Sequence, residues 1–415
     1  MMASRPFPLR EAHAHLLAFG QYQTFLDLSA CASQAEVLEL VRRNATEGWI
    51  VGVGARPAAW PEGDWPTLEA FDRVTGDRPA LLWCFDYHAV LVNSKALAIA
   101  GLTASSADPS GGVLARRADG ALTGVLLERA AHVAWACVPQ PAEAQRPALL
   151  RSALDTLASL GYVEVHDLLS EPWLGPALAA LDDRGELPVQ VHLYPRLEHA
   201  AEVASGRQTW ERDSLRLAGV KVFADGTLNS RTAWMLEPFA DPLPDHPRGT
   251  PIMSPEQLVR AVREAEALRL PLATHAIGDG AVRAVLDAIE TVRPRTSGFR
   301  IEHAEVVDEA DVPRFAQLGV IASVQPCHLL TDIEAIERSL PHRAGRVLPL
   351  RALIDAGCAP GEGLIFGSDV PIVPADPRDS IVAATLRGRS DDPGRVAPEQ
   401  AITEDEAWAC FAASA

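Results

Sequence analysis

Short apolar, β-branched stretches alternate with longer amphipathic stretches from about residue 160 onward. The short stretches predict strands, and the longer ones, whose apolar residues recur at helical spacing, predict helices. A typical helix is expected over 254–268, where Ser254 is the predicted N-cap. The strands expected in this part are 161–169, 187–195, 216–226, 270–280, 299–307, 319–326 and 363–371. This alternation indicates repeated βα units and a parallel sheet.

The N-terminal part of the chain adds an eighth strand within 8–20, followed by a helix expected at about 33–47. Eight parallel strands with intervening helices predict an α/β fold, a (β/α)₈ TIM-like barrel, which needs about 250 residues. The surplus residues lie mostly in 48–150. We therefore interpret 1–415 as one barrel that carries 48–150 as an insertion between its first two strands.

Composition narrows the classes of protein that fit this pattern. The chain has 415 residues, of which 48% are hydrophobic, so it can bury a large core. Its 37 basic and 55 acidic side chains give a net charge of −18, which repels nucleic acid and anionic membranes. No signal segment or long apolar run is visible. These features predict a cytoplasmic protein with a small-molecule substrate and no nucleic-acid or membrane partner.

The spacing of the cysteines and the small number of lysines both bear on the chemistry of the protein. The six cysteines show no C-x-x-C spacing, so they indicate neither a zinc ribbon nor a disulfide framework. Only two of the basic side chains are lysines, Lys95 and Lys221. Arginine cannot become a neutral amine, whereas lysine can, so a lysine kept in an arginine-rich chain is a candidate for amine chemistry.

Side chains that bind metals fall at or near the carboxyl ends of the predicted strands. His13 and His15 alternate by two, so both imidazoles should point to the same side of their strand. His275, His303 and Asp369 follow on later strands, and Lys221 lies on the strand before that of His275. The carboxyl ends of barrel strands form one face, so these groups should converge there. Each residue alone is more often structural, but together they predict a metal site.

The motifs also resemble a known family. The stretches HAVLVNSKAL (88–97), GVKVFADGTLNSRTA (219–233), THAIGDGAV (274–282), FRIEHAEVV (299–307) and FGSDVPI (366–372) are similar to those of the amidohydrolase superfamily of metal-dependent hydrolases. Within it they resemble the branch that includes N-substituted formamide deformylases. The resemblance implies hydrolysis of a non-peptide C–N bond, in an amide or formamide-like group, by metal-activated water.

The resemblance also implies a role for each ligand. His13 and His15 would hold the more buried metal, and His275 and His303 the second. Asp369 would contact the first metal and the attacking water, and Lys221 would bridge both metals as a carboxylated lysine. The expected cofactor is a divalent metal, Zn²⁺, as one or two ions.

Physical chemistry is consistent with this assignment. A carbamate made from CO₂ and neutral Lys221 would place two oxygens between two cations, which arginine cannot do. Zinc ions lower the pKa of bound water to near neutrality and polarise a carbonyl. Asp369 can accept the water's proton and pass it to the departing nitrogen.

Two other functions stay open. One is a mononuclear, deaminase-like hydrolase of the same fold that uses His13, His15, His275 and Asp369, with Lys221 uncarboxylated. The other is a catalytically inactive barrel that serves as a binding or regulatory scaffold, because a common fold does not by itself give a function.

Five further residues are expected to face the substrate. His88 and Asn93 match pocket residues of the family's insertion. Asp225 and Arg231 lie in the loop after the fourth strand, where Arg231 could hold an anionic group or brace the loop in an ion pair. His328 follows the seventh strand and could reach a substrate.

The chain departs from the family pattern at its ends. Members of this branch generally carry a small β-sandwich built from segments before the first strand and after the last helix. Only about ten residues precede the first predicted strand, so the sandwich is expected to be absent or truncated. The chain is then either a barrel-only member or a trimmed form of a longer protein. Assembly into a homo-oligomer stays open.

Overall fold

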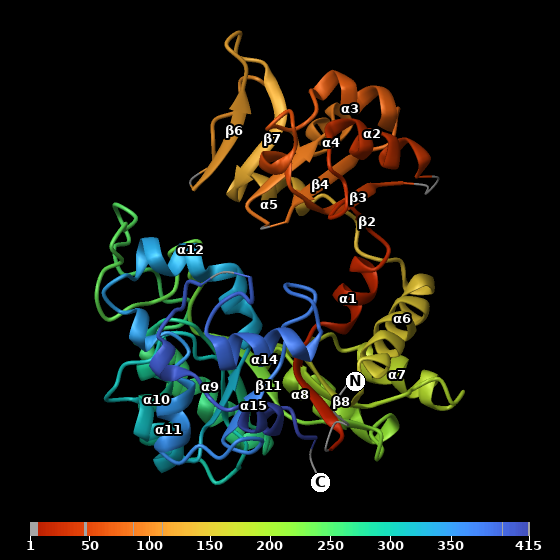
Figure 1. The fold of residues 1–415 in the computed structure, drawn as a ribbon. Coiled ribbons are helices and arrows are strands. Elements are labelled where there is room, and N and C mark those ends of the chain that lie inside the picture. Colours follow the sequence, from red (N-terminus) through yellow and green to blue (C-terminus); the bar gives the residue numbers. More distant parts are fainter. Residues whose placement is uncertain (1–6, 45–47, 86, 110, 392, 414–415) are drawn as a thin grey trace. The chain divides into compact units, whose positions relative to one another are not determined.

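The computed structural model describes residues 7–44, 48–85, 87–109, 111–391 and 393–413. The chain divides into two compact units (Figure 1). The larger unit consists of Met1–Gly20 and Ala144–Ala415, and the smaller unit is Gln21–Glu143.

The strands of the larger unit form two sheets in which every pairing is parallel. The first sheet has the order β1-β8-β9-β10 and the second has the order β11-β12-β13-β14-β15. The strands are β1 (Leu9–Ala14), β8 (Tyr162–Ser170), β9 (Gln190–Pro195), β10 (Leu215–Leu217), β11 (Val220–Phe223), β12 (Leu272–Ala276), β13 (Arg300–His303), β14 (Ile321–Val324) and β15 (Leu364–Phe366). Each predicted strand is present, and the fourth is split into β10 and β11.

Ala218 and Gly219 separate β10 from β11. A Cβ at Gly219 would lie 2.6 Å from the Tyr194 ring and 2.7 Å from the Pro271 carbonyl oxygen, so this position has room for glycine only. The two sheets meet at single parallel bridges, Arg196 with Lys221 and Ala14 with Val370. The α/β fold with parallel strands is therefore confirmed, whereas the hydrogen-bond ladders form two sheets and not one continuous cylinder.

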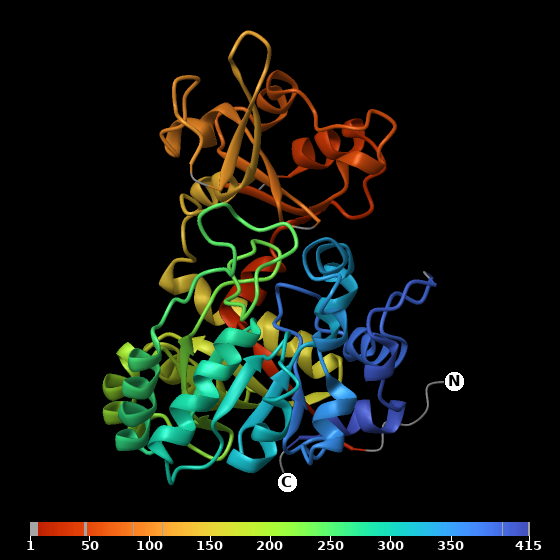
Figure 2. The same ribbon diagram turned by 90° about the vertical axis from the view of Figure 1, so that its left-hand side faces the viewer.

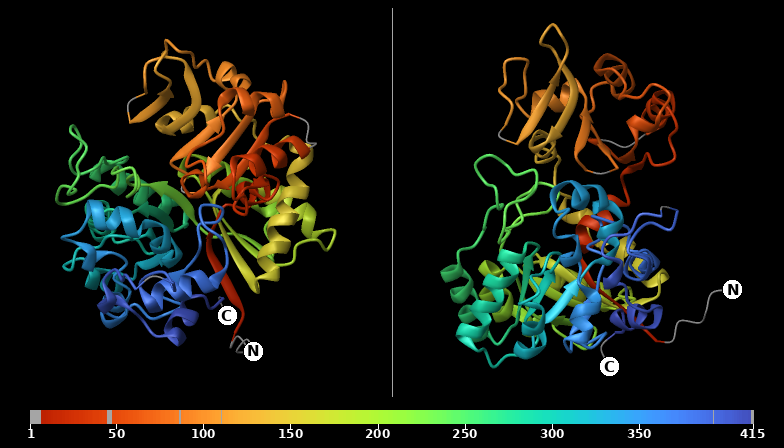
Figure 3. Two further views of the ribbon diagram at one scale, coloured as in Figure 1. Left: turned by 45° about the horizontal axis from the view of Figure 1, so that its top comes forward. Right: turned by 60° about the vertical axis from the view of Figure 1, so that its left-hand side comes forward.

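Helices follow most strands of the larger unit and flank them on the outer side (Figure 2 and Figure 3). The helices are α1 (Leu16–Tyr22), α6 (Arg146–Ser159), α7 (Leu174–Asp182), α8 (Leu197–Gly206), α9 (Pro255–Leu268), α10 (Asp279–Val292), α11 (Val312–Leu318), α12 (Leu329–Ser339), α13 (Leu350–Asp355), α14 (Pro377–Leu386) and α15 (Glu404–Cys410). Helix α9 begins with the predicted cap, a capping box of Ser254 and Gln257. Buried aliphatic side chains such as Leu154, Val285 and Ile301 form one continuous core.

The smaller unit contains a mixed sheet of the order β2-β3-β4-β5-β7-β6. Its elements are β2 (Leu26–Asp27), α2 (Gln34–Arg43), β3 (Ile50–Ala55), α3 (Leu68–Thr75), β4 (Ala80–Cys84), β5 (Ala89–Val92), α4 (Ser94–Ile99), β6 (Gly112–Arg116), β7 (Leu122–Glu128) and α5 (Arg129–Trp135). None of the helices in the described parts of either unit is long and apolar enough to cross a membrane.

The boundaries of the smaller unit differ from the predicted insertion, 48–150. The unit begins at Gln21 because β2 pairs in parallel with β3, joining Leu26 to Gly52. The helix expected at 33–47 is α2, which therefore belongs to the smaller unit. At the other end, α6 packs against the larger unit's core, so the boundary lies at Glu143.

The contact between β1 and β15 leaves no room for a side chain at Gly367. A Cβ there would lie 2.5 Å from the His13 backbone nitrogen and 2.8 Å from Glu11 Oε1. That carboxylate oxygen accepts the backbone N–H groups of His13 and Ser368. We expect Gly367→Ala to lower the free energy of unfolding by about 1–3 kcal/mol because the backbone must move apart, as measured by urea-induced unfolding.

Gly206→Ala is the control, since Gly206 ends helix α8 and a methyl group at this position would meet no neighbouring segment within 4 Å. This variant should be as stable as the parent. Equal stability of both variants would contradict close packing at Gly367.

Candidate metal centre

His13 on strand β1 and His15, one residue after its end, point toward the same carboxylate. His13 Nε2 lies 3.4 Å from Asp369 Oδ1, and His15 Nε2 lies 2.9 Å from the same oxygen. His13 is buried, and burial, followed by the charge of Lys221, lowers its pKa to about 4. The predicted alternation of His13 and His15 therefore brings both imidazoles to Asp369, which lies in the segment after β15.

Lys221 and His275 lie on the neighbouring strands β11 and β12. The register pairs Lys221 with Ala273 and Phe223 with His275, and the His275 ring lies 5.2 Å from the Phe223 ring. Lys221 is buried, and burial lowers the pKa of its amine to about 8. Burial, and then Lys221, lowers the pKa of His275 to about 4. Both side chains are thus in a dry interior that disfavours their cationic forms.

His303 lies between His13 and His275, two of the other candidate ligands. Its ring centroid lies 5.0 Å from that of His13 and 4.5 Å from that of His275. His303 and Asp369 both have left-handed backbone angles, with φ of 70° and 67°. Left-handed backbone at residues other than glycine is uncommon and concentrates at functional sites. The structure therefore brings His13, His15, His275, His303 and Asp369 together, with Lys221 acting electrostatically on His13 and His275.

The donor atoms of this group fit a divalent cation. One ligand atom each from His13, His303 and Asp369 lie within 4.8 Å of one another. His303 Nδ1 is buried and has no hydrogen-bond partner among the described residues. Asp369 Oδ1 is buried too, and it faces the ring nitrogens of His13 and His15 without a well-aligned hydrogen bond. A buried polar atom without a partner is costly, and a bound cation would remove that cost. Imidazole nitrogens with carboxylate oxygen are the donor set that Zn²⁺ prefers.

The buried polar side chains on the Nδ1 side of His13, away from Asp369, were not identified from the sequence. They are Glu302 and its partners Ser323 and Arg300. Glu302 Oε2 lies 2.7 Å from His13 Nδ1 and accepts the hydroxyl of Ser323 at 2.8 Å. Glu302 Oε1 accepts a hydrogen bond from the Arg300 guanidinium. Burial opposes the ionisation of Glu302, but the charges of Arg300 and His13 outweigh it and hold its pKa below the ordinary value. Strict alternation would have placed Glu302 on the face opposite His303, which is why the pattern did not single it out.

A second group of metal-type side chains consists of Glu164, His166 and His192, on strands β8 and β9. His166 Nε2 lies 2.7 Å from Glu164 Oε1 and 3.1 Å from His192 Nδ1. Arg300 Nη1 lies 2.8 Å from His166 Nδ1. Since arginine only donates, Nδ1 must accept, and the neutral ring then carries its proton on Nε2. This nitrogen cannot ligate a cation, so the group is a hydrogen-bond network and not a metal site.

Asp225 and Arg231 have mainly loop-bracing contacts. Asp225 is buried and accepts the backbone N–H groups of Trp234, Ile277 and Gly278. Burial raises the pKa of Asp225 to about 7. Arg231 Nη1 donates to the backbone oxygen and side chain of Asp241, at 3.1 and 3.3 Å. The bracing alternative considered for Arg231 therefore matches its observed contacts.

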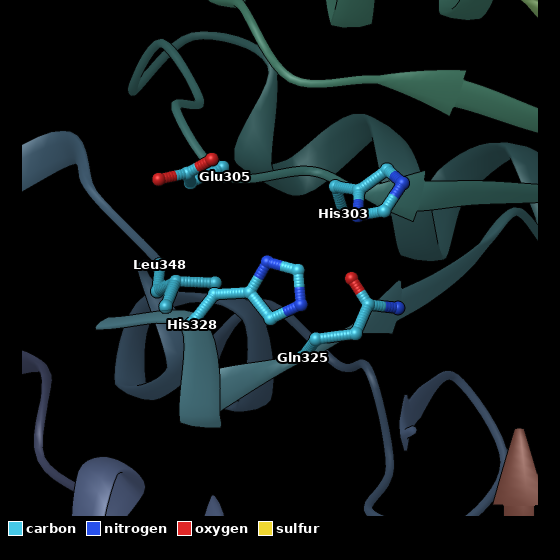
Figure 4. Close-up of a pocket in the computed structure, with 5 residues that line it drawn as sticks. All are labelled: His303, Glu305, Gln325, His328 and Leu348. Atoms are coloured by element: carbon cyan, nitrogen blue, oxygen red, sulfur yellow. The ribbon is translucent and has the colours of Figure 1, made fainter. Parts of the chain in front are cut away.

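His328 lies beside the ligands. Its Nε2 is 3.1 Å from the Ser368 carbonyl oxygen and 4.0 Å from Asp369 Oδ2. Figure 4 shows the small pocket that His328 lines with His303, Glu305, Gln325 and Leu348. Burial, and then the neighbouring Asp332, raises the pKa of Glu305 well above its ordinary value. The pocket is small, and it is lined by both a candidate ligand histidine and a carboxyl group.

His88 and Asn93, predicted to face the substrate, belong to the smaller unit. His88 Nδ1 lies 3.1 Å from both carboxylate oxygens of Glu128. Asn93 is fully buried and caps helix α4: its Oδ1 accepts the N–H groups of Ala80 and Ala96. Its Nδ2 donates to Thr75 Oγ1 and to the Arg78 carbonyl oxygen. The described contacts of Asn93 are thus all internal to the smaller unit.

Comparison with known proteins places this arrangement in context. A sequence model of the amidohydrolase family matches residues 8–414. The Bacillus subtilis protein YtcJ is 32% identical over 399 residues, which cover 92% of this chain and 73% of that protein. The N-substituted formamide deformylase of Arthrobacter pascens is 26% identical, over 96% of this chain and 76% of the deformylase.

A solved structure supports the same placement. The crystal structure of an uncharacterized metal-dependent hydrolase from Pyrococcus furiosus superposes with a TM-score of 0.76 and is 29% identical. The match covers 97% of this chain and 80% of the hydrolase. The likeness therefore extends over both units of the chain.

The contacts of Asn93 predict a structural role for this residue. Asn93→Ala would leave the buried N–H groups of Ala80 and Ala96 without acceptors, so we expect the free energy of unfolding to fall by about 2–4 kcal/mol. Urea-induced unfolding measures this change.

Ser33→Ala, which removes the one cap bond that Ser33 gives helix α2, is the matched control and should cost about 1 kcal/mol. An Asn93→Ala protein with unchanged stability but weaker substrate binding would instead assign Asn93 to the substrate pocket.

Proposed function

Because the chain belongs to the amidohydrolase family, we propose that it hydrolyses a non-peptide C–N bond, in an amide or formamide-like group, with one or two bound divalent metal ions. The observation that carries the proposal is the convergence of His13, His303 and Asp369, together with the buried His303 Nδ1 atom that has no hydrogen-bond partner among the described residues. The formamide deformylase among the relatives favours this class of bond.

The proposal includes the closure of the two parallel sheets into a (β/α)₈ barrel. It is supported by the single bridges at both seams, Arg196 with Lys221 and Ala14 with Val370. In such a barrel the carboxyl ends of the strands form the catalytic face. His13, Lys221, His275 and His303 all lie on strands, so their backbones are fixed before any metal binds.

The proposal assigns the candidate ligands of the larger unit to two sets. His13 and His15, whose Nε2 atoms lie 3.4 and 2.9 Å from Asp369 Oδ1, would hold the first cation together with Asp369. His275 and His303 would hold the second, with His303 close enough to His13 and Asp369 to join the two sets. When bound, Zn²⁺ ions polarise a carbonyl group and lower the pKa of water to near neutrality.

Lys221 would bridge the two sets after reacting with CO₂. The neutral amine attacks the carbon of CO₂, a C–N bond forms, and one proton is released to give a carbamate. Burial lowers the pKa of Lys221 to about 8, which raises the neutral fraction available for this reaction. The other lysine, Lys95, is exposed on helix α4.

Asp369 would move the proton. Burial opposes the ionisation of its carboxylate, but His13, His15 and His303 outweigh it and hold its pKa well below the ordinary value. The carboxylate can take a proton from the attacking water and deliver it to the nitrogen that leaves as an amine. His328 Nε2 lies 4.0 Å from Asp369 Oδ2, and in this proposal it would orient the substrate carbonyl.

Removal of the bridging amine tests the proposal. We expect Lys221→Ala to lower the metal content from two ions per chain to one or none and to reduce turnover by more than about 100-fold, because both cations would lose a ligand. Elemental analysis and hydrolysis of a panel of N-substituted formamides, N-acyl amines and cyclic amides measure these two effects.

Lys95→Ala is the matched control, since it removes the same side chain from an exposed position and should change neither quantity. A full two-metal complement in Lys221→Ala would contradict the carbamate bridge. One metal per chain in the parent protein would favour the mononuclear, deaminase-like hydrolase. A metal-loaded protein that hydrolyses nothing in the panel would favour the binding scaffold.

A further inference from the structure

Three donors from different strands converge on the Glu302 carboxylate. His13 Nδ1 on β1 and Ser323 Oγ on β14 lie 2.7 and 2.8 Å from its Oε2. The Arg300 guanidinium on β13 donates to its Oε1. Glu302 is completely buried, so water does not compete for these contacts. The carboxylate therefore fixes the position of each donor relative to the others.

Arg300 holds both the backbone and the side chain of the His13 segment. Its Nη2 donates to the Ala12 carbonyl oxygen at 2.8 Å, next to His13 in the chain, while its Nε donates to Glu302. The guanidinium also stacks on the Tyr194 ring, 4.5 Å from the ring centroid, and donates to His166. A planar guanidinium offers these donors in fixed directions, which a lysine ammonium does not.

The ion pair of Arg300 and Glu302 determines which ring nitrogen of His13 carries the proton. Arg300 is always charged, and Glu302 is the carboxylate in direct contact with it. An ionised carboxylate only accepts, so His13 Nδ1 must be the protonated nitrogen. Gln325 Nε2 also approaches this nitrogen, but at 3.2 Å it is farther away than Glu302. The lone pair of His13 therefore lies on Nε2, the nitrogen that faces Asp369.

We propose that Arg300 and Glu302 are positioning residues that hold His13 in the Nδ1–H tautomer, with Nε2 directed at the metal centre. The inference rests on the proposed function only in that His13 is taken as a ligand. In metal sites of proteins, such partners orient a ligating histidine and fix its tautomer. Here Arg300 adds a second anchor, the Ala12 backbone, while Glu302, which Arg300 holds, contacts the His13 ring. The pair together sets the strand position and the ring orientation.

Glu302→Gln tests the tautomer of His13. The glutamine side chain has the shape of glutamate, but one of the two carboxylate oxygens is replaced by an N–H₂ donor. The amide oxygen must face Arg300, which cannot give up its proton, so the amide N–H₂ faces His13 Nδ1. His13 Nδ1 must then accept, and the ring proton moves to Nε2. We expect metal affinity to fall about 10- to 100-fold, measured by competition with a chelator for Zn²⁺.

The ¹⁵N spectrum of histidine rings in the metal-free protein gives a readout that needs neither metal nor turnover. The His13 signal, assigned by its loss in His13→Gln, should have the Nδ1–H pattern in the parent protein and the Nε2–H pattern in Glu302→Gln. The same tautomer in both proteins would overturn the proposal. A parent protein that binds no Zn²⁺ would contradict the proposed function, while the spectrum would still decide the tautomer.

Two variants separate the tautomer from general damage to the fold. Ser323→Ala removes a donor from the same carboxylate oxygen and should leave both the tautomer and the Zn²⁺ affinity unchanged. Arg300→Lys keeps the charge but cannot reach Glu302, His166 and the Ala12 oxygen together. It should retain the Nδ1–H tautomer and lower Zn²⁺ affinity less than Glu302→Gln does. An equal loss of affinity in Ser323→Ala and Glu302→Gln would contradict the tautomer argument.

Discussion

Burial of charge is the constraint on which the interior of the larger unit depends. Arg300, Glu302, Lys221 and Asp369 are all nearly inaccessible to water, and an isolated ion in such a place would be strongly destabilising. Arg300 and Glu302 satisfy each other directly. Asp369 is instead contacted by imidazoles, with His15 Nε2 at 2.9 Å and His13 Nε2 at 3.4 Å from its Oδ1. Burial lowers the pKa of Lys221, and the charges of Glu302 and Asp369 oppose this shift. We call Arg300 and Glu302 the lower layer, where opposite charges are in direct contact. Lys221, Asp369 and the candidate histidine ligands form the upper layer, where the charges are less completely paired.

This difference between the layers gives the metal centre its physical basis. In the lower layer, the donors of Arg300 end on carboxylate, carbonyl and imidazole acceptors. In the upper layer, His303 Nδ1 lacks a hydrogen-bond partner within the part of the chain that the structure describes, and Asp369 Oδ1 faces His13 and His15 without a well-aligned hydrogen bond. A network whose hydrogen bonds are all made is rigid, whereas acceptors without donors attract a cation. The Arg300 network can therefore orient the candidate ligands above it without itself binding the metal ion.

Most of the scaffold follows from local pattern, and the sequence predicts it well. Each predicted strand is present because apolar runs bounded by turns are buried on both faces of a parallel sheet. The six ligand-type side chains were found for the same reason, since they interrupt these runs. The limits of the smaller unit were not predicted, because the pairing of Leu26 with Gly52 is a tertiary contact. For Asn93 the motif indicated a pocket residue, whereas its observed hydrogen bonds are set by α4 and by neighbouring residues that no spacing rule connects.

The remaining gap between sequence and structure lies in two backbone angles. Strict alternation on β13 allows only one of Glu302 and His303 to face inward, but the φ of 70° at His303 lets both contribute to the interior. Asp369 leaves β15 with a φ of 67° and turns back toward β1, where its N–H donates to the His13 carbonyl oxygen. Each such angle costs about 1–3 kcal/mol and persists only when its surroundings enforce it. At the end of β15 the enforcing contact comes from the His13 carbonyl oxygen, and at the end of β13 the N–H of Ala304 donates to the Ala276 carbonyl oxygen of β12. A neighbouring strand therefore maintains the conformation at each of the two candidate ligands.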